Sequence, residues 1–300
     1  MHGLDDAFVG RIEATFGAEG RQWLETFPSL LERVCAHWGL VRIRAFPNLS
    51  YNYVAGAERG GEPVVVKLGV PCRELRTEVG ALRVYGGHGA VRLLDADEGL
   101  GALLLERLVP GASLTTLDDA EATVAAAQVM RDLHRAPPLG GAFPTIEDWF
   151  GGFDRLRRRF EGGTGPFPTA LVEAAETMGR ELLAEQAPAR LLHGDLHHEN
   201  VLSAGRAPWL AIDPKGVEGE PAYEPGAWLR NPPGFAQQPG AKERTRRRIA
   251  QFAEILDLDP VRIALWAACQ AVLSVWWSFE DGDREWRSGL GTAELLCSIP

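Results

Sequence analysis

Residues 191–202 read LLHGDLHHENVL, a polar segment between apolar flanks, and this segment decides the fold and the function. Two interpretations of it are open. The segment could hold a metal, as in a zinc hydrolase, because alternate residues of a strand share one face. The candidate ligands are then His193, Asp195, His197 and His198. Alternatively, the segment is a loop in which only Asp195 and Asn200 carry the chemistry.

The composition describes an ordinary globular protein. The chain has 300 residues, of which 45% are hydrophobic and 24% are charged. This length suggests two domains or lobes. The formal net charge of −10 argues against a protein that binds duplex nucleic acid, which needs a basic face. The same charge is compatible with a cationic small molecule as the ligand.

Nothing in the sequence points to a membrane or to an oxidising compartment. The four cysteines form no CxxC pair, so we expect reduced thiols. The first residues, MHGLDDAFVG, lack the pattern of a signal peptide. The longest apolar run, at 263–277, is short for a bilayer span and is expected to be a buried helix. We therefore expect a cytoplasmic protein, without membrane or nucleic-acid partners, that is a monomer.

The hydrophobic pattern changes along the chain. Residues 5–38 have helical spacing, whereas 40–108 read as two hairpins of short strands with a helix at 73–86 between them. The rest is helical except for a hairpin at 200–213. Its helices are expected near 118–134, 145–160, 168–186, 240–257, 260–280 and 283–297. The prediction is an α+β chain with a small antiparallel-sheet lobe at 1–108 (helical 1–39, sheet and helix 40–108) and a mainly helical lobe at 109–300.

Lys67 and Glu78 form the first candidate site pair. Lys67 lies near the end of the strand VVVKL, on the face opposite to Val64 and Val66. Glu78 lies on the apolar stripe of the helix that follows, where a carboxylate is costly unless it is paired. The nearest candidate partner is Lys67, and a lysine anchored in this way is suited to bind polyphosphate.

Asp195, Asn200 and Asp213 form the second candidate set, with the spacing D-x4-N-x12-D across a hairpin. Phosphoryl transfer needs a carboxylate that accepts the proton of the acceptor hydroxyl, and hard oxygen ligands for magnesium. Asp195 suits the first task, and Asn200 and Asp213 suit the second. A metal site made by the histidines would leave Asn200 and Asp213 unexplained.

The order of these motifs resembles a known family. Lys67, Glu78, the connector LLLERL, HGDLHHENVL and IDPKG are similar to the aminoglycoside-phosphotransferase branch of the protein-kinase-like fold. More narrowly, LLHGDLHHENVL and WLAIDPKGVEGEPAYEPGAWLRNP resemble the aminoglycoside/hydroxyurea resistance kinases. The resemblance covers about 40–235 and implies a protein-kinase-like fold of two lobes. It also implies a kinase that uses ATP and Mg²⁺.

The resemblance also implies roles for single residues. Asp195 would be the catalytic base, Asn200 and Asp213 the magnesium ligands, and Lys67, held by Glu78, the contact to the α- and β-phosphates. The backbone of Glu106, Arg107 and Leu108 would meet the adenine. The chain departs from the protein-kinase pattern in having no G-x-G-x-x-G before Lys67, and PNLSYNYV offers Ser50 and Asn52 there instead.

The acceptor is expected to be cationic. The candidate substrate contacts are the carboxylates of Glu218, Glu220, Glu224 and Glu280. The alternative is that Glu224 supports the catalytic loop and that the others are solvated surface residues. A guanidinylated aminoglycoside such as streptomycin fits the candidate contacts and the family resemblance. The alternatives are a kinase of the same fold that acts on another small alcohol or on hydroxyurea and, more distantly, a His/Asp metallohydrolase or a nucleotide-binding module without activity.

Overall fold

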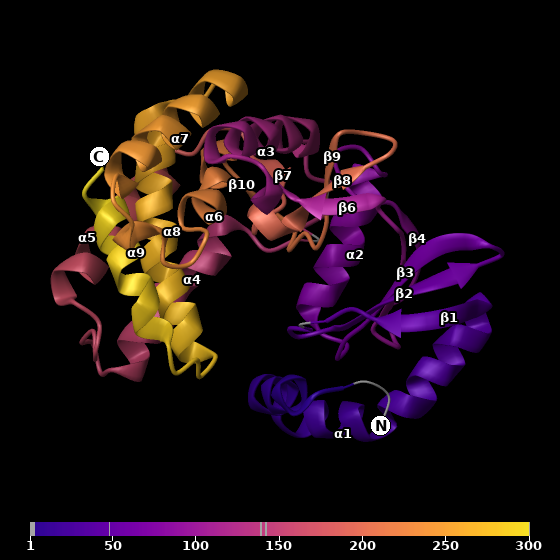
Figure 1. Cartoon of the computed structure of the whole chain (residues 1–300). Coiled ribbons are helices and arrows are strands. Elements are labelled where there is room, and N and C mark those ends of the chain that lie inside the picture. The colour runs from indigo at the N-terminus through magenta and orange to yellow at the C-terminus, as the bar shows by residue number, and fades with distance from the viewer. Residues whose placement is uncertain (1–3, 48, 139, 142, 300) are drawn as a thin grey trace.

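The computed structural model describes residues 4–47, 49–138, 140–141 and 143–299, and they form two lobes (Figure 1). The N-terminal lobe consists of a long helix followed by a sheet with one inserted helix. In chain order its elements are α1 (Asp6–Trp38), β1 (Leu40–Ala45), β2 (Tyr53–Arg59), β3 (Glu62–Leu68), α2 (Arg73–Tyr85), β4 (Leu93–Asp97) and β5 (Ala102–Glu106). This arrangement confirms the predicted sheet with a helix between its two hairpins.

The sheet is antiparallel, with the strand order β1-β2-β3-β5-β4. Its side chains alternate between two layers, as they must in a strand. Val64, Val66 and Leu68 of β3 belong to the core that packs against α1. Val65 belongs with α2 to the other core, and Lys67 bonds a residue of α2. The sheet therefore lies between the two helices, and β3 carries Lys67 on the α2 side (Figure 1).

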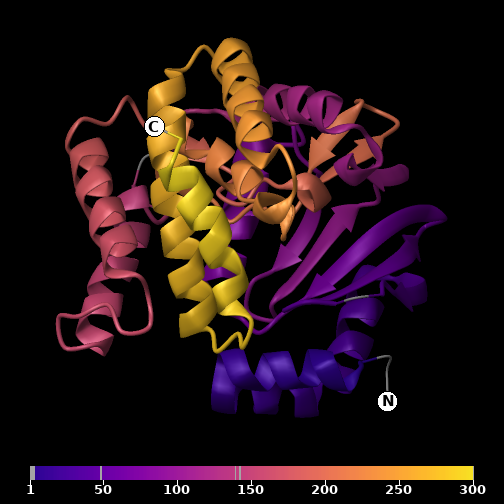
Figure 2. The same ribbon diagram turned by 60° about the vertical axis from the view of Figure 1, so that its left-hand side comes forward.

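Helix α1 begins and ends where its sequence predicts. The side chain of Asp5 accepts a hydrogen bond from the backbone of Phe8, and Gly39 ends the helix in the left-handed conformation. Gly17 interrupts the helix with a φ of 55°. The two arms that result lie along the outer face of the sheet, as Figure 2 shows.

The C-terminal lobe is mainly helical, as predicted. Its helices are α3 (Asp119–Leu133), α4 (Ile146–Arg159), α5 (Thr169–Ala184), α6 (Pro225–Leu229), α7 (Ala241–Leu256), α8 (Pro260–Glu280) and α9 (Leu290–Cys297). Its strands are β6 (Pro110–Ser113), β7 (Arg190–Leu192), β8 (Val201–Ala204), β9 (Trp209–Ala211) and β10 (Val217–Gly219). Short 3-10 turns at 114–116, 198–200, 221–223, 235–237 and 286–289 connect them.

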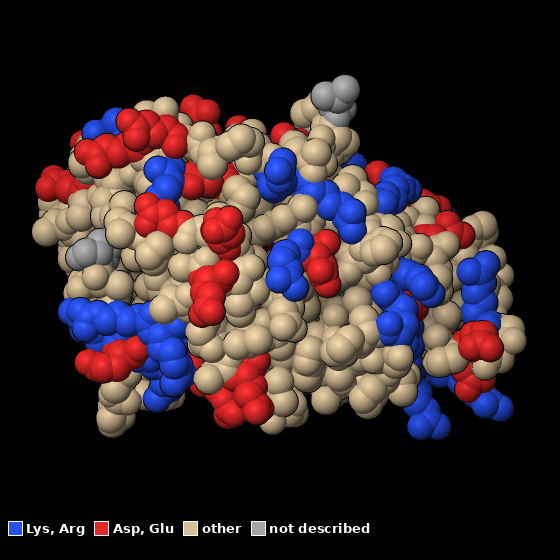
Figure 3. Space-filling view, turned by 90° about the horizontal axis from the view of Figure 1, so that it is seen from above, with Lys and Arg blue, Asp and Glu red and all other residues tan. Residues whose placement is uncertain are grey.

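Helix α8 is the centre of this lobe. It packs against α4, α5, α6, α7 and α9, and most of its residues are buried. It is also the one helix of the described chain that is long and apolar enough to cross a membrane. Its burial by five other helices identifies it as a core helix, as the sequence predicts. Figure 3 shows the top of the molecule, where acidic and basic side chains alternate and neither sign covers the surface.

Three features differ from the prediction, and all involve short elements. The helix expected at 283–297 begins only at Leu290, after a 3-10 turn. The connector after β5 forms β6, which adds to the predicted hairpin to give the sheet β6-β8-β9. Strands β7 and β10, of three residues each, pair with one another on either side of the polar segment. A strand of three residues is too short for its periodicity to be recognised in a sequence.

Helix α2 belongs to a core that it shares with the C-terminal lobe. Its residues Leu75, Val79 and Leu82 belong to the same core as Met130 of α3 and Leu191 of β7. The side of α2 that faces the C-terminal lobe is therefore fixed by packing. The boundary between the lobes at 108 and 109 stays a prediction.

Candidate active site

Lys67 and Glu78 form a buried ion pair. The Nζ of Lys67 lies 2.8 Å from Oε1 and 2.7 Å from Oε2 of Glu78, and each residue is only 5% exposed. Burial raises the pKa of the Glu78 carboxyl to about 7, although the ammonium of Lys67 opposes this shift. The structure thus brings together the strand lysine and the helix carboxylate that the sequence pairs.

Lys67 also joins the two lobes, because its ammonium donates to Oδ1 of Asp213. Asp213 follows β9 and has a φ of 60°, a left-handed conformation that is uncommon for a residue other than glycine. Burial alone would raise the pKa of Asp213, but Lys67 outweighs it and holds the pKa well below the ordinary value. The carboxylate of Asp213 is therefore ionised and fixed beside Lys67.

Glu224 holds the backbone of the loop that carries Asp195. One carboxylate oxygen of Glu224 accepts the backbone N–H of His193 at 2.7 Å, and the other accepts that of Gly194 at 2.9 Å. Glu224 is 1% exposed. Of the two alternatives for Glu224, the structure favours support of the catalytic loop over contact with the acceptor, because its two oxygens fix the backbone just before Asp195.

Asp195 has one engaged oxygen and one open oxygen. Arg230 donates to Oδ1 at 2.7 Å, and the side-chain amide of Asn200 donates to the backbone oxygen of Asp195 at 2.9 Å. Within the described chain, Oδ2 accepts no hydrogen bond, and Nε2 of His197 lies 3.9 Å from it. Burial alone would raise the pKa of Asp195, but Arg230 holds it below the ordinary value. Asp195 is thus an ionised carboxylate with a free acceptor atom.

The histidines of this segment have structural contacts. Nε2 of His193 bonds the backbone oxygen of Ile212 at 2.8 Å, and Nδ1 accepts the backbone N–H of Asp195 at 3.2 Å. His198 stacks on Trp228 with ring centroids 3.7 Å apart. Burial lowers the pKa of both imidazoles to about 4, so both are neutral.

Neither histidine is placed as a metal ligand. Both ring nitrogens of His193 are engaged, and no group of three or more His, Cys, Asp or Glu residues within the described chain is placed to bind a metal. The histidine interpretation of the polar segment therefore has no support from the structure.

Asn200 and Asp213 present oxygens that suit magnesium. Asn200 uses its amide nitrogen to bond Asp195, which leaves its side-chain oxygen for a cation. The backbone N–H of Ile212 donates to the backbone oxygen of Asn200 at 2.9 Å, so the residue lies beside the end of β9. An amide oxygen and an ionised carboxylate form a hard donor set, as Mg²⁺ requires.

The loop between β1 and β2 carries Ser50 and Asn52. The Nε of Arg11, in α1, donates to the backbone oxygen of Ser50 at 3.3 Å. The side-chain oxygen of Asn52 lies close to the backbone of Gly69. A Cβ placed on that glycine would be only 2.0 Å from this oxygen. The side chain of Asn52 therefore supports the loop from within. Contact of this loop with phosphates stays a prediction.

Side chains of the segment 106–108 are engaged within the protein. The carboxylate of Glu106 accepts the Nε of Arg206 at 3.0 Å. The guanidinium of Arg107 lies over the ring of Phe46, 5.4 Å from its centroid, and Leu108 is buried. Only backbone groups of this segment are therefore available for an adenine, as the family resemblance implies.

The other predicted acceptor carboxylates divide into two groups. Glu220 is 2% exposed and accepts the Nε of Arg262 at 2.6 Å, which corrects the expectation that it contacts the acceptor. Glu218 is half-buried in β10, one strand away from the catalytic loop. Glu280, at the end of α8, is bound by Arg155 at 2.7 and 2.8 Å and stays partly exposed.

Two cations at the site were not predicted. Arg230 lies 35 residues from the carboxylate that it binds. Lys215 follows Asp213 by two residues and forms an ion pair with Glu74 of α2. The motif IDPKG contains this lysine, but no periodicity assigns it a partner.

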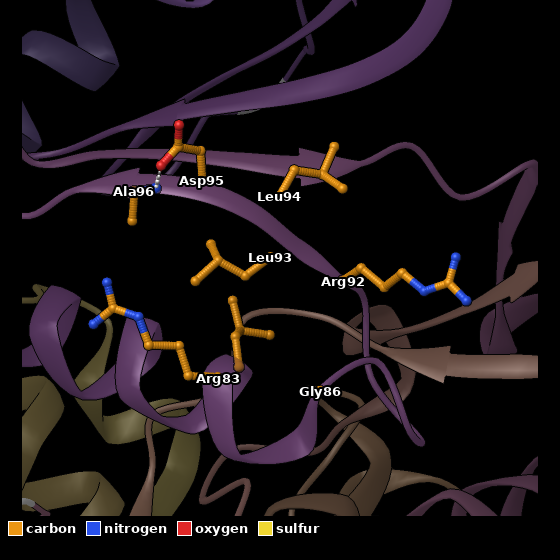
Figure 4. A pocket seen from close by; sticks show the side chains of 8 residues that line it. Arg83, Gly86, Arg92, Leu93, Leu94, Asp95 and Ala96 are labelled. Carbon is orange, nitrogen blue, oxygen red and sulfur yellow. Dashed lines mark hydrogen bonds between the residues drawn. The ribbon is translucent and has the colours of Figure 1, made fainter.

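A pocket lies between the end of α2 and β4 (Figure 4). It is bounded by Arg83 of α2 and by Arg92, Leu93 and Asp95 at β4. None of the candidate catalytic or phosphate-binding residues lines it. This pocket is therefore not part of the candidate active site.

Comparison with known proteins identifies the family. Residues 43–282 match the aminoglycoside/hydroxyurea antibiotic resistance kinases. The chain is 32% identical to streptomycin 6-kinase of Streptomyces griseus over 93% of this chain and 92% of that protein. It is 33% identical to hydroxyurea phosphotransferase of Kitasatospora aureofaciens over 89% and 77% of the two chains.

A solved structure supports the fold. The aminoglycoside phosphotransferase APH(4)-Ia, in a ternary complex with ADP and hygromycin B, matches with a TM-score of 0.65 and 14% identity over 89% of this chain and 97% of that one. The geometry at Asp195 and the match over most of the chain lead to one conclusion. The chain belongs to the aminoglycoside/hydroxyurea antibiotic resistance kinase family and is a phosphotransferase.

Proposed function

We propose that this phosphotransferase moves the γ-phosphoryl group of ATP to a hydroxyl of a streptomycin-like aminoglycoside. The observation that carries the proposal is the carboxylate of Asp195, which Arg230 keeps ionised and which has one open oxygen. A base in this state can accept the proton of an alcohol at neutral pH. The likeness to streptomycin 6-kinase over most of both chains supports the acceptor.

In the proposed reaction the acceptor hydroxyl donates a hydrogen bond to Oδ2 of Asp195. Its oxygen bonds to the γ-phosphorus, the bond to the β–γ bridging oxygen breaks, and that electron pair leaves with ADP. The hydroxyl proton passes to Oδ2 of Asp195. Lys67 contacts the α- and β-phosphates, and Glu78 keeps it in place.

Magnesium would be held by Asn200 and Asp213. When bound, it neutralises charge on the phosphates. Asp195, together with the side chains that contact it, is then the part of the chain that acts on the acceptor hydroxyl.

The end of α8 supports a cationic acceptor. Figure 2 shows this end pointing toward the N-terminal lobe. Burial and the charge of Asp281 raise the pKa of Tyr51, in the loop between β1 and β2. Burial and the neighbouring Glu280 raise the pKa of Asp281 itself. A guanidinium group of the acceptor would relieve the repulsion between these carboxylates.

Hydroxyurea is the second candidate acceptor, because hydroxyurea phosphotransferase is equally similar in sequence. It is small and neutral, so the carboxylates at the end of α8 would not contribute to its binding. We extend the proposal to a monomeric enzyme of the cytoplasm, where ATP is available.

The test is an ADP-release assay with streptomycin, hydroxyurea, choline and a buffer blank, with mass spectrometry of each acceptor. We expect release with streptomycin and a product that has gained one phosphoryl group. Asp195→Ala should still bind ATP but should lose most turnover. Release with hydroxyurea or choline alone would refute the aminoglycoside, and full turnover by Asp195→Ala would refute the assigned base.

A further inference from the structure

Lys215 is a rigidly placed lysine that the proposed mechanism does not use. Its backbone N–H donates to the backbone oxygen of His193 at 2.8 Å, and its backbone oxygen accepts the hydroxyl of Thr77 at 2.6 Å. Its ammonium forms an ion pair with Glu74, in the first turn of α2. The backbone of this lysine is therefore tied to the catalytic loop and to α2 together.

The side chain of Lys215 lies beside the catalytic base. A Cβ placed on Gly194 would be 3.4 Å from the Cβ of Lys215. The side chain of Lys215 therefore begins next to the residue that precedes Asp195. Burial alone would lower the pKa of this lysine, but neighbouring carboxylates raise it, and the ammonium stays protonated. These carboxylates belong to Asp213, Glu74 and Asp195.

The charge of Lys215 acts on both ends of the proposed reaction. It lowers the pKa of Asp195, the proposed base, and of Asp213, the proposed magnesium ligand. The position of this permanent cation follows from its contacts. Its backbone bond to His193 and the closeness of its Cβ to Gly194 place it beside the loop of the proposed base. Its ion pair with Glu74 places the ammonium at α2, the helix that also holds Lys67 through Glu78.

The amino-acid usage of the chain gives an independent reason to regard this lysine as functional. Of 31 basic residues, only Lys67, Lys215 and Lys242 are lysines. Two of these three lie at the site. Lysine offers a compact ammonium with three donors, whereas the guanidinium of arginine is planar and larger. A small cation fits beside a phosphoryl group that is also approached by a base and a metal.

The pair with Glu74 does not explain the lysine. The side chain of Glu74 is 59% exposed, whereas that of Lys215 is 30% exposed. Water therefore screens this pair, and such pairs contribute little to stability. An ammonium in a screened pair can exchange its partner for a phosphate oxygen at little cost.

We propose that Lys215 is a catalytic residue that leaves Glu74 and contacts the oxygens of the γ-phosphoryl group during its transfer. This inference rests on the proposed function. The lysine stays protonated and moves no proton, since the hydroxyl proton passes to Asp195 and the leaving electron pair to ADP. Its ammonium stabilises the charge that spreads over the phosphoryl oxygens in the transition state.

The experiment compares Lys215→Met, Lys215→Arg, Glu74→Ala and the control Lys242→Met. Lys242 is the third lysine, and it donates to the backbone oxygen of Ser298, in the C-terminal lobe. The measurements are kcat with the best acceptor, the Kd values for ADP and for AMP-PNP, and the melting temperature. ADP lacks the γ-phosphoryl group, so the ratio of the two Kd values isolates contacts to that group.

We expect Lys215→Met to lower kcat by about 100- to 1,000-fold, the range for removal of one transition-state donor. Its affinity for AMP-PNP should fall more than its affinity for ADP. Lys215→Arg should recover part of the turnover, and Glu74→Ala and Lys242→Met should keep most of it. Near wild-type kcat in Lys215→Met would overturn the inference.

A merely structural lysine would give a different pattern. Glu74→Ala would then lose as much activity as Lys215→Met, and the affinities for ADP and AMP-PNP would fall equally. If the wild type binds both nucleotides but phosphorylates no tested acceptor, the proposed function fails. The ratio of the two Kd values then still decides whether Lys215 contacts the γ-phosphoryl group.

Discussion

Replacement of Arg230 should move the pH dependence of catalysis. Arg230 binds Oδ1 of Asp195 at 2.7 Å, and the two side chains are only 21% and 25% exposed. A hydrogen bond to a charged group in such a place contributes roughly 1.5–3 kcal/mol. In Arg230→Met the ionised form of Asp195 should therefore lose stabilisation of about this size, and the pKa of Asp195 should rise.

The direction of this pKa change follows from the charge of the Asp195 carboxylate. Arg230 holds the pKa of Asp195 below its ordinary value, against the effect of burial. Without the arginine, burial is opposed only by the weaker charges of groups such as His197 and Lys215, so the base becomes protonated at a higher pH. The acid limb of the kcat/KM profile should therefore shift to higher pH. The stability that this ionised carboxylate contributes is present above its unfolded pKa and is lost as pH falls through its folded pKa.

The assay is the pH profile of kcat/KM for the wild type, Arg230→Met and the matched control Arg157→Met. Arg157 binds Glu176 through two hydrogen bonds of 2.8 and 2.6 Å between α4 and α5, away from the site. The control should keep the wild-type acid limb. If Arg230→Met lowered turnover equally at every pH, the arginine would not act through the pKa of Asp195, and the reasoning would be refuted.

Two further predictions follow from the carboxylates. Asp281→Asn should raise KM for streptomycin by several-fold and leave KM for hydroxyurea unchanged, because only the first acceptor is cationic. Steady-state kinetics with both acceptors decide this, with Asp257→Asn as the control, an exposed carboxylate next to the opposite end of α8. Glu224→Gln should lower the free energy of unfolding by about 1–3 kcal/mol, because an amide satisfies only one of two buried backbone donors. Urea denaturation measures it, and an unchanged midpoint with an unchanged slope would contradict the role.

The sequence predicts those contacts whose two partners each have a recognisable local pattern. Lys67 and Glu78 could be paired because strand alternation places the first and helical periodicity places the second. The buried position of Glu224 could not be predicted, because nothing in YEPGAW distinguishes a carboxylate that caps a loop from one that faces solvent. Arg230 and Asp195 meet only through the packing of α6 against the core, which no local pattern encodes.

The contacts of α2 indicate how the two lobes keep a fixed position relative to each other. Glu74, Thr77 and Glu78 stand at i, i+3 and i+4, so they lie on one face of the helix. Glu78 binds Lys67, which also binds Asp213, whereas Glu74 and Thr77 bind the ammonium and the backbone oxygen of Lys215. Through Glu78 and Thr77 this face therefore holds the phosphate lysine and the loop of the proposed magnesium ligand, whereas the exposed pair of Glu74 adds little. Because the adjoining residues Leu75, Val79 and Leu82 are buried in the core, a rotation of the helix would break these contacts together.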